Sequence, residues 1–227
     1  LLAILTFALF VAADYFLHYY RKAAPATEGA ETTPAVEPGF ALEPALEPVW
    51  VSGYQMPEKL YYHKGHTWAR VLSGDTVAIG VDDFARRLIG RASSVEMPEV
   101  GSWVTQGSPG ARVRVGERLA EVVAPVEGEV VEVNTALANN PALSTDDPYG
   151  RGWLYKIQSG RLASNLRNLL SGRLAQKWME DAREQLEVRL MALSGSVLQD
   201  GGEIASDFSR HVEDKDWDSL VEHFLLT

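Results

Sequence analysis

The residues best suited to chemistry are two histidines and two acidic pairs. His63 and His66 stand three positions apart and could share a metal ion, but a strand would point them to opposite faces. The adjacent residues Asp82 and Asp83, like Asp146 and Asp147, could act as general acids or bases. Such pairs are also typical of helix starts and turns. We therefore predict no metal site and no catalytic residues.

Composition excludes several further activities. The chain has 227 residues and no cysteine, so it forms no disulfide, thiolate metal site or cysteine nucleophile. It contains no phosphate-binding glycine loop, no G-x-S-x-G motif and no H-E-x-x-H motif. The net charge of −10 is unfavourable for nucleic-acid binding, which usually needs a basic surface. We expect a protein that is not an enzyme and does not bind nucleic acid.

Residues 1–22 predict a transmembrane helix. About 20 helical residues span a hydrocarbon core of roughly 30 Å, and the first 13 residues contain one polar side chain, Thr6. An aromatic belt and two cations follow and are predicted to lie at the membrane interface: Tyr15, Tyr19, Tyr20, Arg21 and Lys22. The positive-inside rule then places the rest of the chain in the cytoplasm, on a bacterial-type inner membrane.

Alternatives to this anchor remain open. Asp14 and His18 share one helix face and would meet either the lipid headgroups or a neighbouring membrane helix. The apolar segment could instead be a cleaved signal peptide. An inverted topology would make the chain a periplasmic binding module.

Residues 23–58 predict an extended, acidic tether. This segment holds six of the 11 prolines and six glutamates, with no lysine or arginine. Proline fixes φ and removes backbone donors, so an extended spacer is expected rather than a folded element. Apolar side chains that could contact a partner within it include Phe40, Trp50 and Tyr54.

Residues 59–160 predict a mainly β domain. Short runs rich in β-formers alternate with glycine turns, and residues 82–88 form the one short helical insert. Many strands at this spacing indicate a flattened barrel or sandwich. The expected strands are 68–72, 76–81, 93–97, 111–115, 118–123 and 129–134.

Several blocks stand out in this region. In chain order they are YYHKGHTW at 61–68, IGVDDFA at 79–85, VEMPEVG at 95–101, APVEGEVVEVN at 124–134, the pair Asn140-Pro141, and DPYGRGWL at 147–154. Together they resemble the glycine cleavage system H protein. Several collinear blocks are more specific than any single motif. The resemblance implies a lipoyl-type fold.

One departure from that family concerns its cofactor. The family's carriers bear lipoate on a lysine at a hairpin tip, in a motif similar to E-S-V-K-A-A-S-D. Counting back from Pro125, this position falls on Glu117, and a carboxylate cannot form the amide. No lysine lies between Lys64 and Lys156. An arginine cannot take its place, because a guanidinium does not form this amide. We therefore expect no lipoyl arm and no cofactor.

Arginines near the same tip form a candidate binding patch. Arg112, Arg114 and Arg118 could contact an acidic partner or anionic lipid headgroups, or could be an ordinary solvated surface. A second basic group, Arg86, Arg87 and Arg91, has the same ambiguity.

Residues 161–227 predict a helical C-terminal region. Leucines and Trp178 recur every four residues from Leu162, which predicts a long helix ending near Ser194. A further amphipathic helix is expected after Asp216, with its apolar face formed by Trp217, Leu220, Val221, Phe224 and Leu225. These helices would either bind a partner or pack on the β domain.

Together these features predict a non-catalytic, membrane-anchored accessory subunit of a larger respiratory or photosynthetic membrane complex. The H-like domain would serve there as a scaffold on the cytoplasmic face, in contact with other subunits and the bilayer. The alternative is a lipoyl-type carrier related to the glycine cleavage system.

Overall fold

The computed structural model describes residues 46–194 and 208–227. The expected membrane helix at 1–22, its interface residues and Phe40 lie outside these residues. Among the helices that are described, none is both long and apolar enough to cross a bilayer.

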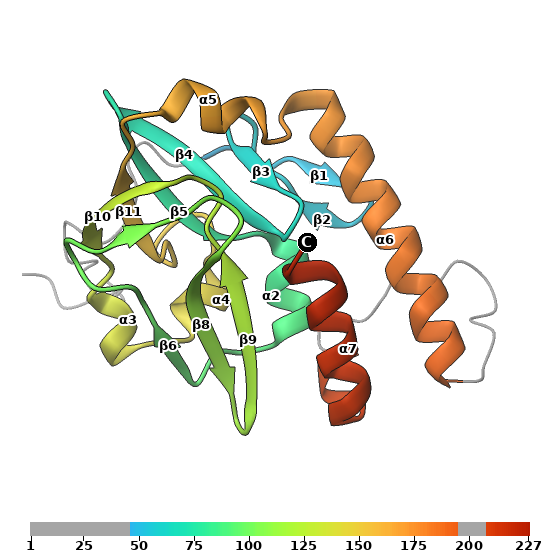
Figure 1. The fold of residues 1–227 in the computed structure, drawn as a ribbon. Helices are drawn as coiled ribbons and strands as arrows, with labels where there is room; N and C mark the ends of the chain where they lie inside the picture. Colours follow the sequence, from blue (N-terminus) through green and yellow to red (C-terminus); the bar gives the residue numbers. More distant parts are fainter. Residues whose placement is uncertain (1–45, 195–207) are drawn as a thin grey trace, which may run out of the picture. The chain divides into compact units, whose positions relative to one another are not determined.

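Two antiparallel sheets form the β domain (Figure 1). The larger one contains, in spatial order, β3 (Tyr61–His63), β4 (Thr67–Ser73), β5 (Thr76–Val81), β11 (Tyr155–Gln158), β10 (Gly128–Val133) and β7 (Trp103–Val104). The smaller one contains β6 (Ser94–Glu96), β8 (Pro109–Val115) and β9 (Arg118–Val123). The expectation of a mainly β domain is confirmed.

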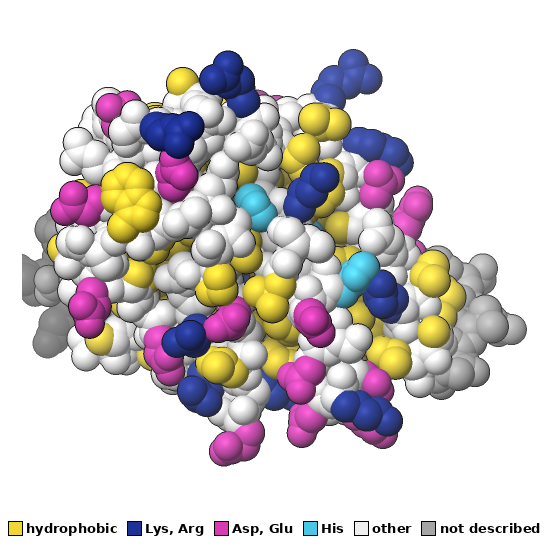
Figure 2. Space-filling model, viewed as in Figure 1, with side chains coloured by type: hydrophobic (Ala, Val, Ile, Leu, Met, Phe, Trp, Pro, Cys, Tyr) yellow, Lys and Arg dark blue, Asp and Glu magenta, His cyan; other side chains and the backbone are white. Residues whose placement is uncertain are grey.

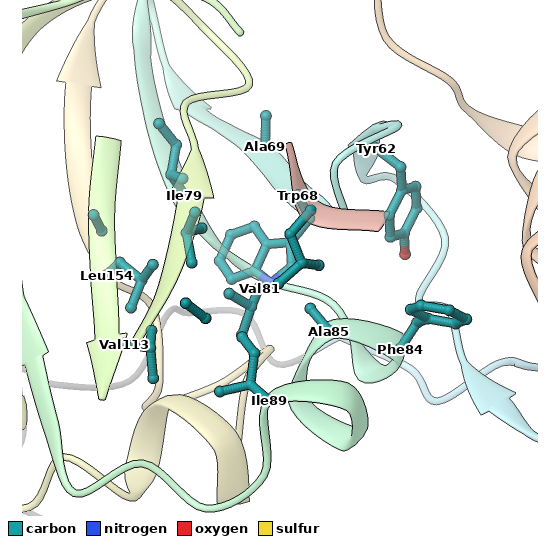
Figure 3. Packing of buried hydrophobic residues seen from close by; sticks show 14 of the residues in the cluster. Tyr62, Trp68, Ala69, Ile79, Val81, Phe84, Ala85, Ile89, Val113 and Leu154 are labelled. Atoms are coloured by element: carbon teal, nitrogen blue, oxygen red, sulfur yellow. The ribbon is translucent and has the colours of Figure 1, made fainter. Parts of the chain in front are cut away.

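A single apolar core joins the sheets to the helices. Trp68 is fully buried near its centre, with Val81 beside it and Ile89 of the first helix below (Figure 3). A side chain at Gly80 would collide with the Trp68 ring, so this strand position needs glycine. The core therefore depends on close contact between the ring and the neighbouring strand.

The expected helical insert forms α2 (Asp83–Ile89). Asp82 caps it, because its carboxylate accepts a 2.8 Å hydrogen bond from the Ala85 amide. The helix ends at Gly90, whose φ of +89° suits a glycine. Two short helices, α3 (Ala136–Asn139) and α4 (Leu143–Asp146), lie between β10 and β11 in the chain.

The tether prediction needs correction for residues 50–55. They form a hairpin of β1 (Trp50–Val51) and β2 (Tyr54–Gln55), closed by Ser52 and Gly53, both with positive φ. Positive φ at both central residues gives a turn whose twist matches that of paired strands. The hairpin packs on α2, so its anchoring contacts give these residues a fixed structure despite the surrounding prolines.

The C-terminal region is helical, but the predicted long helix is interrupted. The described part of the region consists of α5 (Leu162–Arg167), α6 (Gly172–Ser194), the 3-10 turn η1 (Phe208–His211) and α7 (Asp214–Leu225). Between α5 and α6, Leu170 exchanges two 2.8 Å backbone hydrogen bonds with Tyr62 of β3. This bridge and the positive φ of Gly172 end the helical register.

The interruption changes part of the buried face of α6. Leu174 and Leu193 belong to the predicted stripe but are 64% and 44% exposed. Leu186 of the same stripe is buried, together with Ala175, Met179 and Ala182. The predicted stripe is therefore wrong at Leu174, just after the break in the helix, and right at Leu186. For α7 the predicted face is confirmed, since all five of its apolar residues are buried.

Candidate functional site

The tip of hairpin β8–β9 is the candidate site that the sequence singles out. Val115 pairs with Arg118, which leaves Gly116 and Glu117 as a two-residue turn. Gly116 has a φ of +60°, the conformation that the first residue of such a turn requires. The Glu117 side chain is exposed. The tip thus presents a carboxylate to solvent, and hairpin 109–123 contains no lysine.

Arg118, beside the tip, binds the chain's own C-terminal segment. Its guanidinium donates hydrogen bonds of 2.7 Å to the Ser209 carbonyl and 2.6 Å to the Val212 carbonyl. It also pairs with Asp214 at 2.8 Å and lies 5.3 Å from the centre of the Trp217 ring. Arg118 was expected to bind a partner, but these contacts occupy its donors within the chain.

Arg112 and Arg114 are part of an ion-pair ladder across β6, β8 and β9. Arg112 lies 3.1 Å from Glu121, and Arg114 lies 3.3 Å from Glu96. Figure 2 shows acidic and basic side chains intermixed over this face instead of a basic patch. The surface near the tip is close to neutral, so we do not regard it as a docking site for anionic lipids.

The second basic group is also paired. Arg86 and Arg87 both bind the carboxylate of Asp83, and Arg87 donates a further 2.6 Å hydrogen bond to the Gly53 carbonyl. Arg91 lies 3.4 Å from Asp146. Arg87 thereby joins α2 to the turn of the β1–β2 hairpin, while the pairs with Asp83 lie within α2.

His66 and His63 have different environments. His66 is buried, and its Nδ1 lies 2.8 Å from the Asp82 carboxylate while its ring stacks on Phe84. His63 Nδ1 accepts a hydrogen bond from the Gly65 amide. Burial, together with the nearby His66 and Lys64, lowers the pKa of His63, which favours the neutral ring. Within the described residues no group of metal ligands occurs.

The two acidic pairs have structural roles. Besides capping α2, Asp82 fixes His66, while Asp83 accepts a 2.9 Å hydrogen bond from the Gln55 amide. The Asp147 carboxylate accepts a 2.8 Å hydrogen bond from the Arg151 amide. These contacts match the turn and helix-start interpretation.

The tether's two described aromatic candidates differ in exposure. Tyr54 is buried against Phe84, with the Arg87 guanidinium 4.6 Å from its ring centre, so it is not available to a partner. Trp50 is 61% exposed and remains available. The hairpin is further fixed by Tyr149, whose hydroxyl donates to the Gln55 carbonyl at 2.7 Å and accepts from the Asp83 amide at 2.9 Å.

Comparison with known proteins decides the family. The sequence model described as "Glycine cleavage H-protein" matches residues 60–182. This chain belongs to the glycine cleavage H-protein family. A probable glycine cleavage system H protein of Thermococcus gammatolerans is 39% identical over 130 residues, which are 57% of this chain and 96% of that protein.

Other H proteins are similarly related. The glycine cleavage system H protein of Acinetobacter baylyi is 41% identical over 107 residues, covering 47% of this chain and 86% of its own. The crystal structure of an H protein from Mycobacterium marinum has 31% identity and a TM-score of 0.48, covering 56% of this chain and 98% of its own. The family model and these sequence relatives confirm the resemblance seen in the sequence blocks.

Membership of this family favours one of the two expected functions over the other. It agrees better with the alternative, a carrier related to the glycine cleavage system, than with a membrane accessory subunit. The H-family match ends at residue 182, so η1 and α7 lie beyond it.

Some important residues were not found from the sequence. The contact between Arg118 and the C-terminal segment joins residues more than 90 positions apart, and no local pattern indicates it. Trp103 lies on β7, a two-residue strand that is too short for a sequence pattern to indicate which side chain is exposed. Its exposure is evident only in the folded chain.

Proposed function

We propose that this chain is an H-family protein that works as a non-catalytic binding subunit without a lipoyl arm. The observation that carries the proposal is the carboxylate of Glu117 at the β8–β9 tip, in a hairpin without a lysine. Lipoate is attached through an amide to a primary amine, and a glutamate offers none. We take Glu117 to stand where the family's carriers have their lysine.

The contacts of Arg118 support this proposal. A carrier needs a tip that an attaching enzyme can reach and an arm that moves between active sites. Here the residue next to the tip is held by two carbonyls and a carboxylate of the C-terminal segment. A hairpin fixed in this way suits a rigid binding surface.

Lipoyl carriage is the second candidate function, and the relation to H proteins favours it. The domain at 59–160 contains three lysines, of which Lys59 is exposed just before β3. Lys64 is exposed in the turn between β3 and β4. Lys156 is held by Glu132 at 2.8 Å and lies 4.5 Å from the centre of the Trp153 ring. None of these lysines lies at the β8–β9 tip.

Intact-mass spectrometry separates the two functions. The chain would be produced together with lipoate-attaching enzymes, and an H protein that carries the family's lysine would show that those enzymes are active. We expect the chain to keep the mass of its sequence, whereas the double variant Glu117→Lys with Arg118→Ala gains a lipoyl amide. A lipoyl adduct on the chain without substitutions would establish the carrier function and refute our proposal.

Membrane attachment is a separate part of the proposal. We propose, from the apolar run at 1–22 and the cations Arg21 and Lys22, that this segment anchors the H-type domain on the cytoplasmic face of a membrane. Other subunits of a membrane complex are the proposed partners.

A further inference from the structure

Trp103 is the most exposed tryptophan among the described residues, at 63%. It lies on β7, the edge strand of the six-stranded sheet. Its partner across the strand pair is Glu129, and Val131, which lies at a bulge two residues further along β10, is 38% exposed. Val100, 59% exposed, and Glu99 precede it in the adjoining turn. We call Glu99, Val100, Trp103, Glu129 and Val131 the Trp103 patch.

The backbone beneath this patch is fixed by hydrogen bonds. The Gly101 amide donates to the Val130 carbonyl at 2.7 Å, and the Val130 amide donates to the Ser102 carbonyl at 2.9 Å. Ser102 also closes the turn, because its amide and its hydroxyl both donate to the Glu99 carbonyl. A partner that covers Trp103 would not have to order this backbone, which reduces the entropy cost of binding.

The carboxylates of the patch are not neutralised within the described part of the chain. Glu99 and Glu129 are exposed and form no ion pair there. The glutamates on either side of Glu129 do form pairs, since Glu127 lies 3.5 Å from Arg161 and Glu132 lies 2.8 Å from Lys156. Unpaired negative charge is thus concentrated beside the exposed indole.

We propose that the Trp103 patch docks a protein segment that presents an arginine or lysine beside an apolar side chain. The cation would lie over the Trp103 ring and pair with Glu99 or Glu129, while the apolar side chain covers Val100 and Val131. Exposed aromatic residues on a rigid backbone are the usual centres of such interfaces. The inference rests on the proposed binding function and names the surface and partner chemistry.

Indole N–H signals in NMR spectra of the full chain in detergent micelles test this site. The probe is the peptide acetyl-Arg-Leu-Arg-Leu-amide, and acetyl-Glu-Leu-Glu-Leu-amide is the charge-reversed control. We expect the basic peptide to shift the Trp103 indole signal saturably and to leave the Trp50 signal in place. Trp50 is the matched control because it is 61% exposed but lies on β1.

Variants assign the interaction to the patch. Trp103→Ala should weaken peptide binding about tenfold, as truncation of a central interface aromatic does, and Trp50→Ala should not. Glu99→Gln together with Glu129→Gln should weaken binding and reduce its dependence on salt. Equal effects of Trp50→Ala and Trp103→Ala would refute the site, because they would indicate general attraction to an acidic chain. So would an unshifted Trp103 signal.

These outcomes are independent of the lipoylation test. A lipoyl adduct on the chain without substitutions would refute the proposed function and leave the peptide result unaffected. A failure of the peptide to bind would refute the patch while the mass of the chain stays as proposed.

Discussion

Single residues near the β8–β9 tip carry the proposed function. Glu117 presents a carboxylate where we propose that carriers of the family have their lysine, and Arg118 ties the adjacent strand to the C-terminal segment. Both effects follow from side-chain chemistry at neighbouring positions. The other arginines of the expected patch are paired on the surface and contribute little, because exposed ion pairs are weak.

Replacement of Arg118 tests its structural role. Arg118→Ala removes three hydrogen-bonded or ionic contacts from a partly buried guanidinium, so we expect the free energy of unfolding to fall by about 1–3 kcal/mol. Arg112→Ala is the control and should change it by less than about 0.5 kcal/mol, since its ion pairs are exposed. Urea denaturation measures both values. Equal losses would contradict the special role of Arg118.

The burial of Tyr54 makes the stability of the fold sensitive to alkaline pH. Burial is the main reason that its pKa rises from 10.0 to about 12. Between these values the unfolded chain loses the phenolic proton while the folded chain keeps it, so stability falls as the pH rises above about 10. Tyr54→Phe removes this contribution, and the decline in stability between pH 10 and 12 should become shallower.

The same variant should be tolerated at neutral pH. The Tyr54 hydroxyl is buried and has no hydrogen-bond partner among the described residues. Its removal relieves an unsatisfied polar group, while the ring and its contact with Arg87 remain. We expect unchanged or slightly higher stability in urea denaturation at pH 7. A marked loss would mean that the hydroxyl has a partner.

At the scale of elements, local patterns located several strands but not the break in the C-terminal helix. The predicted strands at 76–81 and 118–123 coincide with β5 and β9, because glycine turns and β-rich runs mark them locally. The register of α6 depends on the bridge between Leu170 and Tyr62, which joins residues far apart in the chain. A helical period cannot reveal such a break.

Substitutions on α6 test the corrected face. Met179 is fully buried, so Met179→Ala should cost about 2–5 kcal/mol. Leu174→Ala, the control at a predicted core position, should cost less than about 1 kcal/mol because Leu174 is largely exposed. Thermal and urea unfolding measure the difference. If Leu174→Ala cost more stability than Met179→Ala, the buried face would be the one predicted for an uninterrupted helix.

For the whole molecule, membrane attachment rests on the sequence of residues 1–22. We expect the full chain to sediment with membranes and to resist alkaline carbonate extraction, because a spanning apolar helix is effectively irreversibly inserted. A variant without residues 1–22 should appear in the supernatant. Release of the full chain by carbonate would contradict an anchor.

The sequence alone determined the family, the mainly β domain, the apolar face of α7 and the absence of a lysine in the hairpin. These features are local in the chain: collinear blocks, strand and turn composition, helical period and residue identity. The tertiary structure decided which charges are free. It paired Arg112, Arg114 and Arg118 within the chain and buried Tyr54. It also left Trp103 exposed opposite Glu129, which forms no ion pair within residues 46–194 and 208–227. Exposure and pairing depend on contacts between distant segments, and only the folded chain brings those segments together.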